Sequence, residues 1–132
     1  MCKNKCKINA FVSEFYRSGS FSLQDPDNNM ICFGVLKKEN YFFSKGIYAP
    51  LQHITFATED VEKFENFYQR KLGFQVTDRV VKSTGELATS FTTSNHEHHT
   101  IACFKSSQNG IDHHSYEAGE WNNIKIWCDH FA

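Results

Sequence analysis

The sequence predicts an α+β fold built from paired βαβββ units, the last of which is incomplete. The first observation is an internal repeat with a period of 60 residues, which aligns Leu51–Phe56 with Ile111–Tyr116. The second is an amphipathic helical pattern that begins eight residues after a histidine in each copy. The third is a set of three strand-like segments that follow the first helix. Together they give one complete unit and the opening of the next.

Composition restricts the class of protein. A chain of 132 residues with 40% hydrophobic and 22% charged residues is typical of one globular domain, which excludes disordered and low-complexity proteins. Fourteen basic residues against fifteen acidic ones give a net charge of -1, with both signs scattered. The sequence therefore lacks the basic patch that a nucleic-acid or anionic-membrane partner would require.

Cysteine usage and hydropathy indicate the compartment. No apolar run approaches the roughly 18–20 residues of a transmembrane helix, and the first residues have no apolar core of a signal peptide. The five cysteines lack the paired spacing of a zinc ribbon or a disulfide framework, so we expect reduced thiols and a cytoplasmic protein. Cys2 and Cys6 have no second pair nearby, which disfavours a metal site there.

Residues 1–36 are expected to be the tail of a preceding βαβββ unit. Apolar residues on the two sides of Asp25-Pro-Asp-Asn-Asn29 predict a hairpin over 18–35. Proline after aspartate favours a type I turn, and asparagine tolerates the left-handed backbone position that follows. Residues 37–49, polar and aromatic, are predicted to be a linker.

Residues 50–107 are expected to form the complete unit. Its helix is predicted over 60–72, because acidic residues suit the first turn and Arg70 and Lys71 suit the last. Gly73 stands where a left-handed cap would end this helix. Strand character is found in the following segments: 74–81, 87–93 and 100–104.

Residues 110–132 repeat only the opening strand and helix. The helical pattern here is carried by these residues: Trp121, Ile124, Trp127, Cys128 and Phe131. The three closing strands of this copy are missing from the sequence. The exposed edges that two incomplete units would leave favour self-association, so we expect a homo-oligomer.

The repeat also indicates a metal site. His53 and His113 hold the same position in the two copies, so units that pack about a pseudo-twofold axis would project both side chains into one interior. Because neighbouring residues of a strand face opposite sides, His114 should point away from that interior. The sequence therefore predicts two histidine ligands for one ion.

The stretch His96-Glu-His-His99 lacks the helical spacing of a zincin motif. The alternation of Ile101 and Cys103 behind His99 predicts that His99 shares a strand face with buried positions, while His98 faces the other way.

The sequence resembles the vicinal-oxygen-chelate superfamily (glyoxalase, bleomycin-resistance proteins and dioxygenases), and within it the type I extradiol ring-cleaving (catechol 2,3-) dioxygenases. The similarity runs from about Ser20 to the end of the chain. The more specific motifs that carry it are these: Leu51-Gln-His-Ile54, Asn95-His-Glu-His-His-Thr-Ile-Ala102, and His113-His-Ser-Tyr-Glu117 leading into Trp121. The stretch ending at Ala102 is the most particular to ring-cleaving enzymes.

This resemblance implies an Fe(II) ion, in some members Mn(II), held by two histidines and one glutamate. His53 and His113 match the two histidine ligands. His99 matches the histidine that handles protons around bound oxygen. The implied substrates are a catechol, which binds through its vicinal oxygens, and O2.

One ligand departs from the family pattern. The family glutamate comes from the last strand of the fourth unit, which this sequence lacks, and the equivalent position in the hairpin is Cys32. We therefore expect a fragment of a roughly twice-longer enzyme.

Other interpretations stay open. A binding module like the bleomycin-resistance proteins would trap a small ligand without chemistry, although a proton-handling histidine argues against it. A glyoxalase-like isomerase would need more carboxylate ligands than the strands offer. The thirteen phenylalanines suit either a ring-accepting cavity or an ordinary core. In the simplest alternative, the histidines only pack within a folded remnant.

Overall fold

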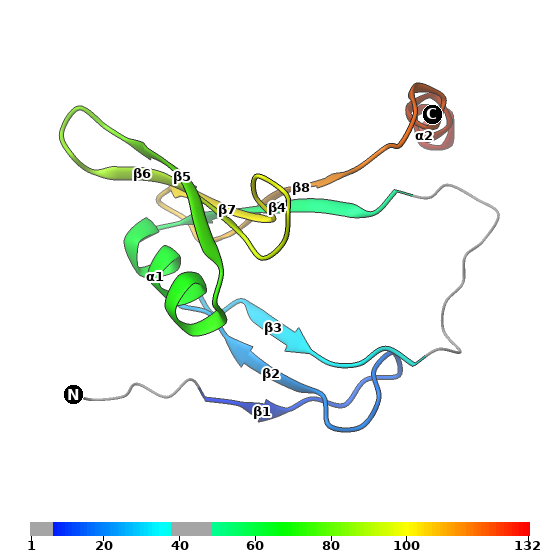
Figure 1. Ribbon diagram of the computed structural model, residues 1–132, viewed down its shortest axis with the longest axis horizontal. Helices are drawn as coiled ribbons and strands as arrows, with labels where there is room; N and C mark the ends of the chain where they lie inside the picture. The colour runs from blue at the N-terminus through cyan, green and yellow to red at the C-terminus, as the bar shows by residue number, and fades with distance from the viewer. Residues whose placement is uncertain (1–6, 38–48) are drawn as a thin grey trace.

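The computed structural model describes residues 7–37 and 49–132, so Cys2, Cys6 and most of the expected linker 37–49 lie outside the described residues. It contains a three-stranded sheet in the order β1-β2-β3 and a five-stranded sheet in the order β5-β6-β7-β4-β8 (Figure 1). The elements are β1 (Asn9–Ala10), β2 (Phe21–Gln24), β3 (Met30–Phe33), β4 (Leu51–Thr58), α1 (Val61–Leu72), β5 (Gln75–Val81), β6 (Leu87–Thr93), β7 (Ile101–Lys105), β8 (Gly110–Tyr116) and α2 (Trp121–Phe131).

The order β4-α1-β5-β6-β7 confirms the predicted α+β fold with a βαβββ unit. β5, β6 and β7 form an antiparallel meander, and β7 returns to pair in parallel with β4. β8 pairs antiparallel with the other edge of β4. The larger sheet therefore joins the two copies of the repeat through their opening strands.

The register between β4 and β8 turns the sequence repeat into a spatial symmetry. Ile54 pairs with His114, and these two residues occupy the same position in the two copies. A local twofold axis therefore passes through this pair. Since sides alternate along a strand, His53 and His113 lie on one face of the sheet, while Ile54 and His114 lie on the other.

The helix α1 ends at the predicted residue and begins one residue later than predicted, at Val61. Asp60 caps the first turn by accepting a hydrogen bond from the Lys63 N–H (2.9 Å), and Gly73 ends the helix in a left-handed conformation with φ 81°. It packs on the larger sheet, against β5, β6 and β7 and, through the contact of Phe64 with Phe56, against β4. The buried core consists of these residues: Phe56, Val61, Phe64, Tyr68 and Cys103.

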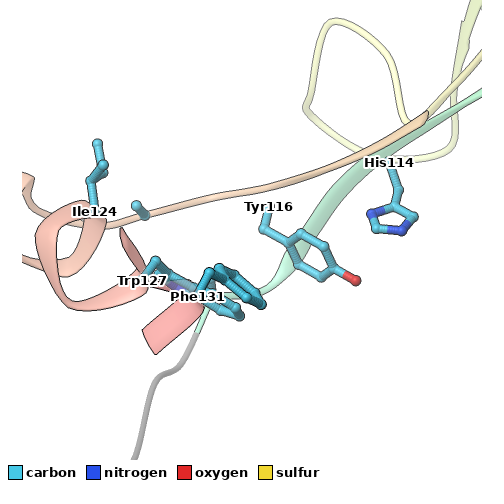
Figure 2. Close-up of a pocket in the computed structure, with 7 residues that line it drawn as sticks. His114, Tyr116, Ile124, Trp127 and Phe131 are labelled. Atoms are coloured by element: carbon cyan, nitrogen blue, oxygen red, sulfur yellow. The ribbon is translucent and has the colours of Figure 1, made fainter. Parts of the chain in front are cut away.

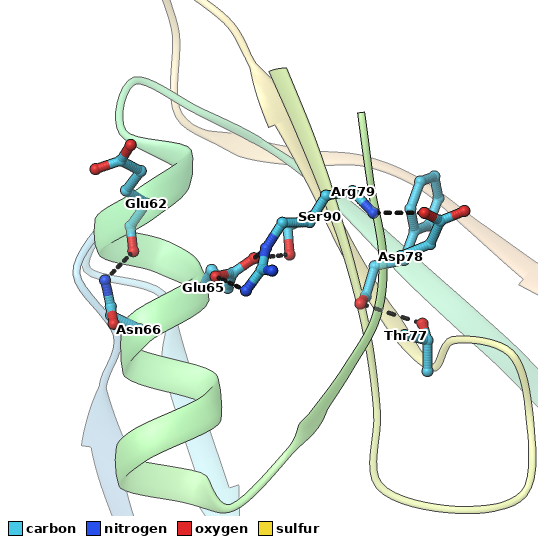
Figure 3. A network of polar contacts seen from close by, with 8 residues as sticks. Glu62, Glu65, Asn66, Thr77, Asp78, Arg79 and Ser90 are labelled. Carbon is cyan, nitrogen blue, oxygen red and sulfur yellow. Dashed lines mark hydrogen bonds and ion pairs between the residues drawn. The ribbon is translucent and has the colours of Figure 1, made fainter. Parts of the chain in front are cut away.

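A polar network ties α1 to the meander (Figure 3). The Glu65 carboxylate accepts two hydrogen bonds from the Arg79 guanidinium of β5 (2.8 and 2.9 Å) and one from the Ser90 hydroxyl of β6 (2.6 Å). The bond from Arg79 lowers the pKa of Glu65 and Ser90 acts in the same direction, against the effect of burial. Glu65 thus links three elements.

The N-terminal hairpin β2–β3 forms where the sequence predicts it and lies beside α1 (Figure 1). Asp25 accepts hydrogen bonds from the N–H groups of Asp27 and Asn29 (2.9 and 2.8 Å), and Asn28 takes the left-handed conformation with φ 66°. The buried Tyr68 hydroxyl of α1 donates to Asp25 (3.2 Å). The short strand β1, which was not predicted from the sequence, adds the third strand of this sheet.

The second helix, α2, contrasts with α1. None of its residues is buried, and Trp121 and Phe131 keep 82% and 75% of their surface exposed. Neither helix in the described part of the chain is both long and apolar enough to cross a membrane. The cysteines that the structure describes, Cys32, Cys103 and Cys128, are free thiols.

Candidate functional site

His53 of β4 and His113 of β8 come together on one face of the larger sheet. Their Nε2 atoms are 3.2 Å apart, and the two rings meet edge to face at 5.4 Å between centroids. The pairing of β4 with β8 produces this contact, because each histidine lies one residue from the local twofold axis. The structure thus brings together the two residues that the repeat singled out.

The other ring nitrogen of each histidine has a side-chain acceptor from the preceding residue. His53 Nδ1 contacts the amide oxygen of Gln52, and His113 Nδ1 lies 2.6 Å from a carboxylate oxygen of Asp112. The sequence patterns did not predict roles for Gln52 and Asp112. The signal was available, because these two residues are themselves 60 positions apart in the repeat.

These contacts fix which nitrogen carries the proton. An amide oxygen and a carboxylate oxygen only accept hydrogen bonds, so Nδ1 of His53 and of His113 must each donate. In neutral rings the two Nε2 atoms then face each other with bare lone pairs. Burial, followed by the proximity of His113, lowers the pKa of His53, which disfavours a shared proton as the way to relieve this repulsion.

The spacing suits two ligands of one ion. Two imidazole nitrogens that bind one metal at about 2.1 Å in adjacent coordination positions lie about 3 Å apart. Neutral imidazoles with free Nε2 lone pairs are common metal ligands. The His53 and His113 pair therefore fits two positions of a mononuclear site.

Among the described residues, no third protein ligand lies near this pair. In the part of the chain that the structure describes, no three His, Cys, Asp or Glu side chains are arranged to hold a metal ion. Cys32 of β3 lines an apolar cavity together with Ile54, a residue on the sheet face opposite His53. The hairpin therefore supplies no ligand to the histidine pair.

His99 lies against His53, with 4.6 Å between ring centroids, and against Phe91 of β6 at 5.1 Å. The predicted strand alternation was wrong here. β7 begins only at Ile101, so the preceding loop does not alternate, and His99 reaches the face opposite Ile101. His98 was expected to point the other way, but its Nδ1 lies 3.0 Å from that of His99.

The surroundings keep His99 neutral. Burial is the largest cause that lowers its pKa, and the neighbouring imidazoles of His53, His98 and His113 add to this effect, whereas Glu97 opposes it. A neutral imidazole beside the histidine pair can accept a proton and return it.

His114 belongs to a separate aromatic cluster. It contacts Tyr116, which stacks with Trp127 of α2, and Trp127 stacks with Phe131 (Figure 2). These side chains line a cavity of about 370 Å³ between β8 and α2. His114 therefore faces away from His53 and His113, as the strand alternation predicts.

A second cavity of about 440 Å³ lies between the hairpin and the face of the sheet that carries α1. Its wall is mainly apolar and includes Met30, Phe33, Phe56, Leu72 and Ile111. Because Ile54 also lines it, this cavity is separated from the histidine pair by the sheet itself.

Solved structures share this fold. Homoprotocatechuate 2,3-dioxygenase from Brevibacterium fuscum and the enzyme of that name from Arthrobacter globiformis each match with a TM-score of 0.72, at 19% and 20% identity. The match covers 94% of this chain but only 37% and 41% of those chains. This chain therefore spans about two fifths of the length of the enzymes whose fold it shares.

Sequence comparison gives the family. No curated protein matches the chain significantly. The family model of the Glyoxalase/Bleomycin resistance protein/Dioxygenase superfamily matches residues 51–132, which begin at β4 and include all three histidines of the site. With well over half of its length matched and the βαβββ fold in place, the chain belongs to the Glyoxalase/Bleomycin resistance protein/Dioxygenase superfamily.

Proposed function

We propose that this chain is part of an Fe(II)-dependent extradiol dioxygenase, in which His53 and His113 hold the metal ion. Mn(II) is the alternative ion. The observation that carries the proposal is the pair of Nε2 atoms facing each other at 3.2 Å while both Nδ1 atoms are held by acceptors. The fold shared with homoprotocatechuate 2,3-dioxygenases supports it.

The residues of this chain would have different roles in the reaction. His53 and His113 bind the ion, which would supply a Lewis-acidic centre with open positions for a catechol and O2. His99, next to His53 and held neutral, accepts a proton from the substrate and delivers it later in the reaction. Phe91 packs against the His99 ring and limits its movement.

The His53 and His113 pair supplies two of the three protein ligands of the proposed site, and a carboxylate is the third. Two neutral imidazoles neither complete the two-histidine, one-carboxylate set nor balance the charge of the ion. The fold relatives are more than twice as long as this chain, so we propose that the carboxylate comes from a further part of a longer polypeptide. Catechol cleavage is proposed for that whole protein.

The exposed residues near β8 and the free cysteines bear on the oligomeric state and the cellular location. β8 forms an edge of the larger sheet, and next to it Tyr116, Trp121 and Phe131 are exposed. Such an edge favours association, so we propose a homo-oligomer. The free thiols of the described cysteines are consistent with a cytoplasmic location.

Metal binding by the chain tests the proposal. Anaerobic titration with Fe(II), followed by calorimetry, should give weak binding at one site, lost in His53→Ala and in His113→Ala. The matched control is His114→Ala, which removes the neighbouring imidazole from the opposite face and should leave binding unchanged. With a catechol and O2 added to the longer protein, His99→Ala should lower turnover by roughly 10²–10⁴-fold while metal content is kept. Iron binding that persists in both His53→Ala and His113→Ala would contradict the assignment.

A second candidate function is the binding of a small apolar ligand without chemistry. The cavity of about 440 Å³ behind the sheet favours it, because its wall is mainly apolar. Ligand binding that survives His53→Ala and is lost when Phe33, which lines this cavity, is replaced by a charged residue would favour this candidate.

A further inference from the structure

We propose that Gln52 and Asp112 are a matched pair of positioning residues, which turn the Nε2 atoms of His53 and His113 toward one ion by holding their Nδ1–H groups. This inference rests on the proposed metal function and deepens it. It assigns a task to two residues outside the ligand set, and it makes the two ligand positions unequal.

The first observation is that both residues are bulged out of the β4–β8 ladder. Along β4, Leu51 pairs with Tyr116 and His53 with Ser115, so Gln52 is an extra residue without a partner. Along β8 the pairing steps past Asp112 in the same way. The ladder therefore contains two β-bulges, related by the same local twofold axis as the histidines.

The bulges explain an otherwise unexpected contact. In a regular strand, adjacent side chains point to opposite faces and do not meet. A bulge re-aims the side chain of the extra residue and bends the strand locally. At both bulges the re-aimed side chain lies against the histidine that follows it, Gln52 on His53 and Asp112 on His113.

The chemistry of these contacts indicates that they orient the two histidines for metal binding. The ring nitrogen that does not bind a metal commonly donates to a carboxylate or carbonyl oxygen, which fixes the tautomer and raises the basicity of the ligand. Gln52 and Asp112 both accept from Nδ1, so both histidines present Nε2 as a donor to the same point.

The two positions differ in charge. Asp112 offers a carboxylate oxygen, with which the His113 ring forms a charge-assisted hydrogen bond, whereas Gln52 offers a neutral amide oxygen. His113 is therefore the more strongly polarised ligand. The repeat has kept the geometry of the two positions and changed the charge of one of them.

Nitrogen NMR of the metal-free protein tests the positioning role directly. We expect the Nδ1–H tautomer for both histidines in the wild type. Asp112→Ala should remove this tautomer preference at His113 and leave His53 unchanged. Gln52→Ala should remove it at His53 and leave His113 unchanged. Asp112→Asn keeps an acceptor oxygen and should restore the tautomer. An unchanged His113 tautomer in Asp112→Ala would overturn the inference.

Calorimetry with Co(II) as the probe measures the consequence for metal binding. Asp112→Ala should weaken Co(II) binding about 10–100-fold, and Asp112→Asn should weaken it less. Gln52→Glu should strengthen it, since it adds the missing charge at the second position. The control is Glu120→Gln, which removes an equal charge at the start of α2, where this side chain makes no cap hydrogen bond. Equal binding in wild type and Asp112→Ala would overturn the inference and leave the proposed function intact.

The NMR and calorimetry measurements distinguish a failure of the positioning inference from a failure of the proposed metal function. A wild-type protein that shows both tautomers as expected, loses them as expected in the variants, and binds no Co(II) would support the positioning pair and refute the metal function. Circular dichroism checks that each variant folds. If Asp112→Ala does not fold, Asp112→Asn provides the test.

Discussion

The helices α1 and α2 occupy equivalent places in the two copies of the repeat, yet their surroundings differ. Each begins eight residues after the histidine of its opening strand, His53 or His113, and both are amphipathic. However, α1 buries Val61, Phe64, Glu65 and Tyr68, whereas no residue of α2 is buried. Only α1 is followed in this chain by strands that it packs against, β5, β6 and β7. An apolar helix face is therefore stabilised by its partners and not by its own pattern.

The polar contacts of the two helices differ in the same way. Glu65 of α1 lies within a network that reaches β5 and β6. The ion pair of α2, Lys125 with Asp129, joins two exposed side chains of the same helix. Tertiary contacts therefore make the polar groups of one copy structural, while those of the other copy remain on the surface. Three substitutions test how far this contrast extends.

The largest effect is expected for Phe64→Ala. Phe64 is 2% exposed and packs between Phe56 and Tyr68, so its removal leaves a cavity in the core and should cost about 3–5 kcal/mol of unfolding free energy. The same change at Phe131 of α2 should cost less than about 1 kcal/mol. Urea denaturation measures both. Similar losses at the two positions would mean that α2 is buried in solution, and the contrast between the copies would fail.

An intermediate effect is expected for Glu65→Ala. It leaves the buried Ser90 hydroxyl and the Arg79 guanidinium without their acceptor, which should cost about 1–3 kcal/mol. Asp129→Ala, which breaks the exposed pair of α2, should cost no more than about 0.5 kcal/mol.

The pH dependence sharpens this test. Because the folded-state pKa of Glu65 is lowered, its contribution is present above the ordinary glutamate pKa of 4.5 and is lost as the pH falls through the lowered value. The difference in unfolding free energy between wild type and Glu65→Ala should therefore be constant near neutral pH and shrink in acid. A difference that grows in acid would show that Glu65 is not the acceptor of Arg79 in solution.

The smallest effect is expected for Tyr68→Phe. The Tyr68 hydroxyl joins α1 to the hairpin through Asp25, which keeps its own hydrogen bonds from Asp27 and Asn29 when the hydroxyl is removed. The loss should be about 0.5–1.5 kcal/mol, measured by thermal or urea unfolding. Tyr116→Phe, at a half-exposed position of β8, should change stability by less than about 0.5 kcal/mol. No loss in Tyr68→Phe would indicate that the hairpin is held by its apolar contacts alone.

The sequence by itself determined the local elements. Helical spacing together with the Asp60 and Gly73 ends set the bounds of α1, and the Asp25 turn set the hairpin, because capping and turn formation depend on residues a few positions apart. The repeat also predicted that His53 and His113 would meet. These two histidines are far apart in the sequence, but the prediction that they meet requires only that the two equivalent opening strands pair with each other.

Only the tertiary structure decided the details of the site. The two bulges that aim Gln52 and Asp112 arise from the register between β4 and β8, which no local pattern specifies. The loop before β7 placed His98 and His99 on one face, because alternation holds only where a strand is hydrogen-bonded to its neighbours. The exposure of α2 was decided likewise, since burial depends on which surfaces are present to cover a helix, and its own sequence does not contain them.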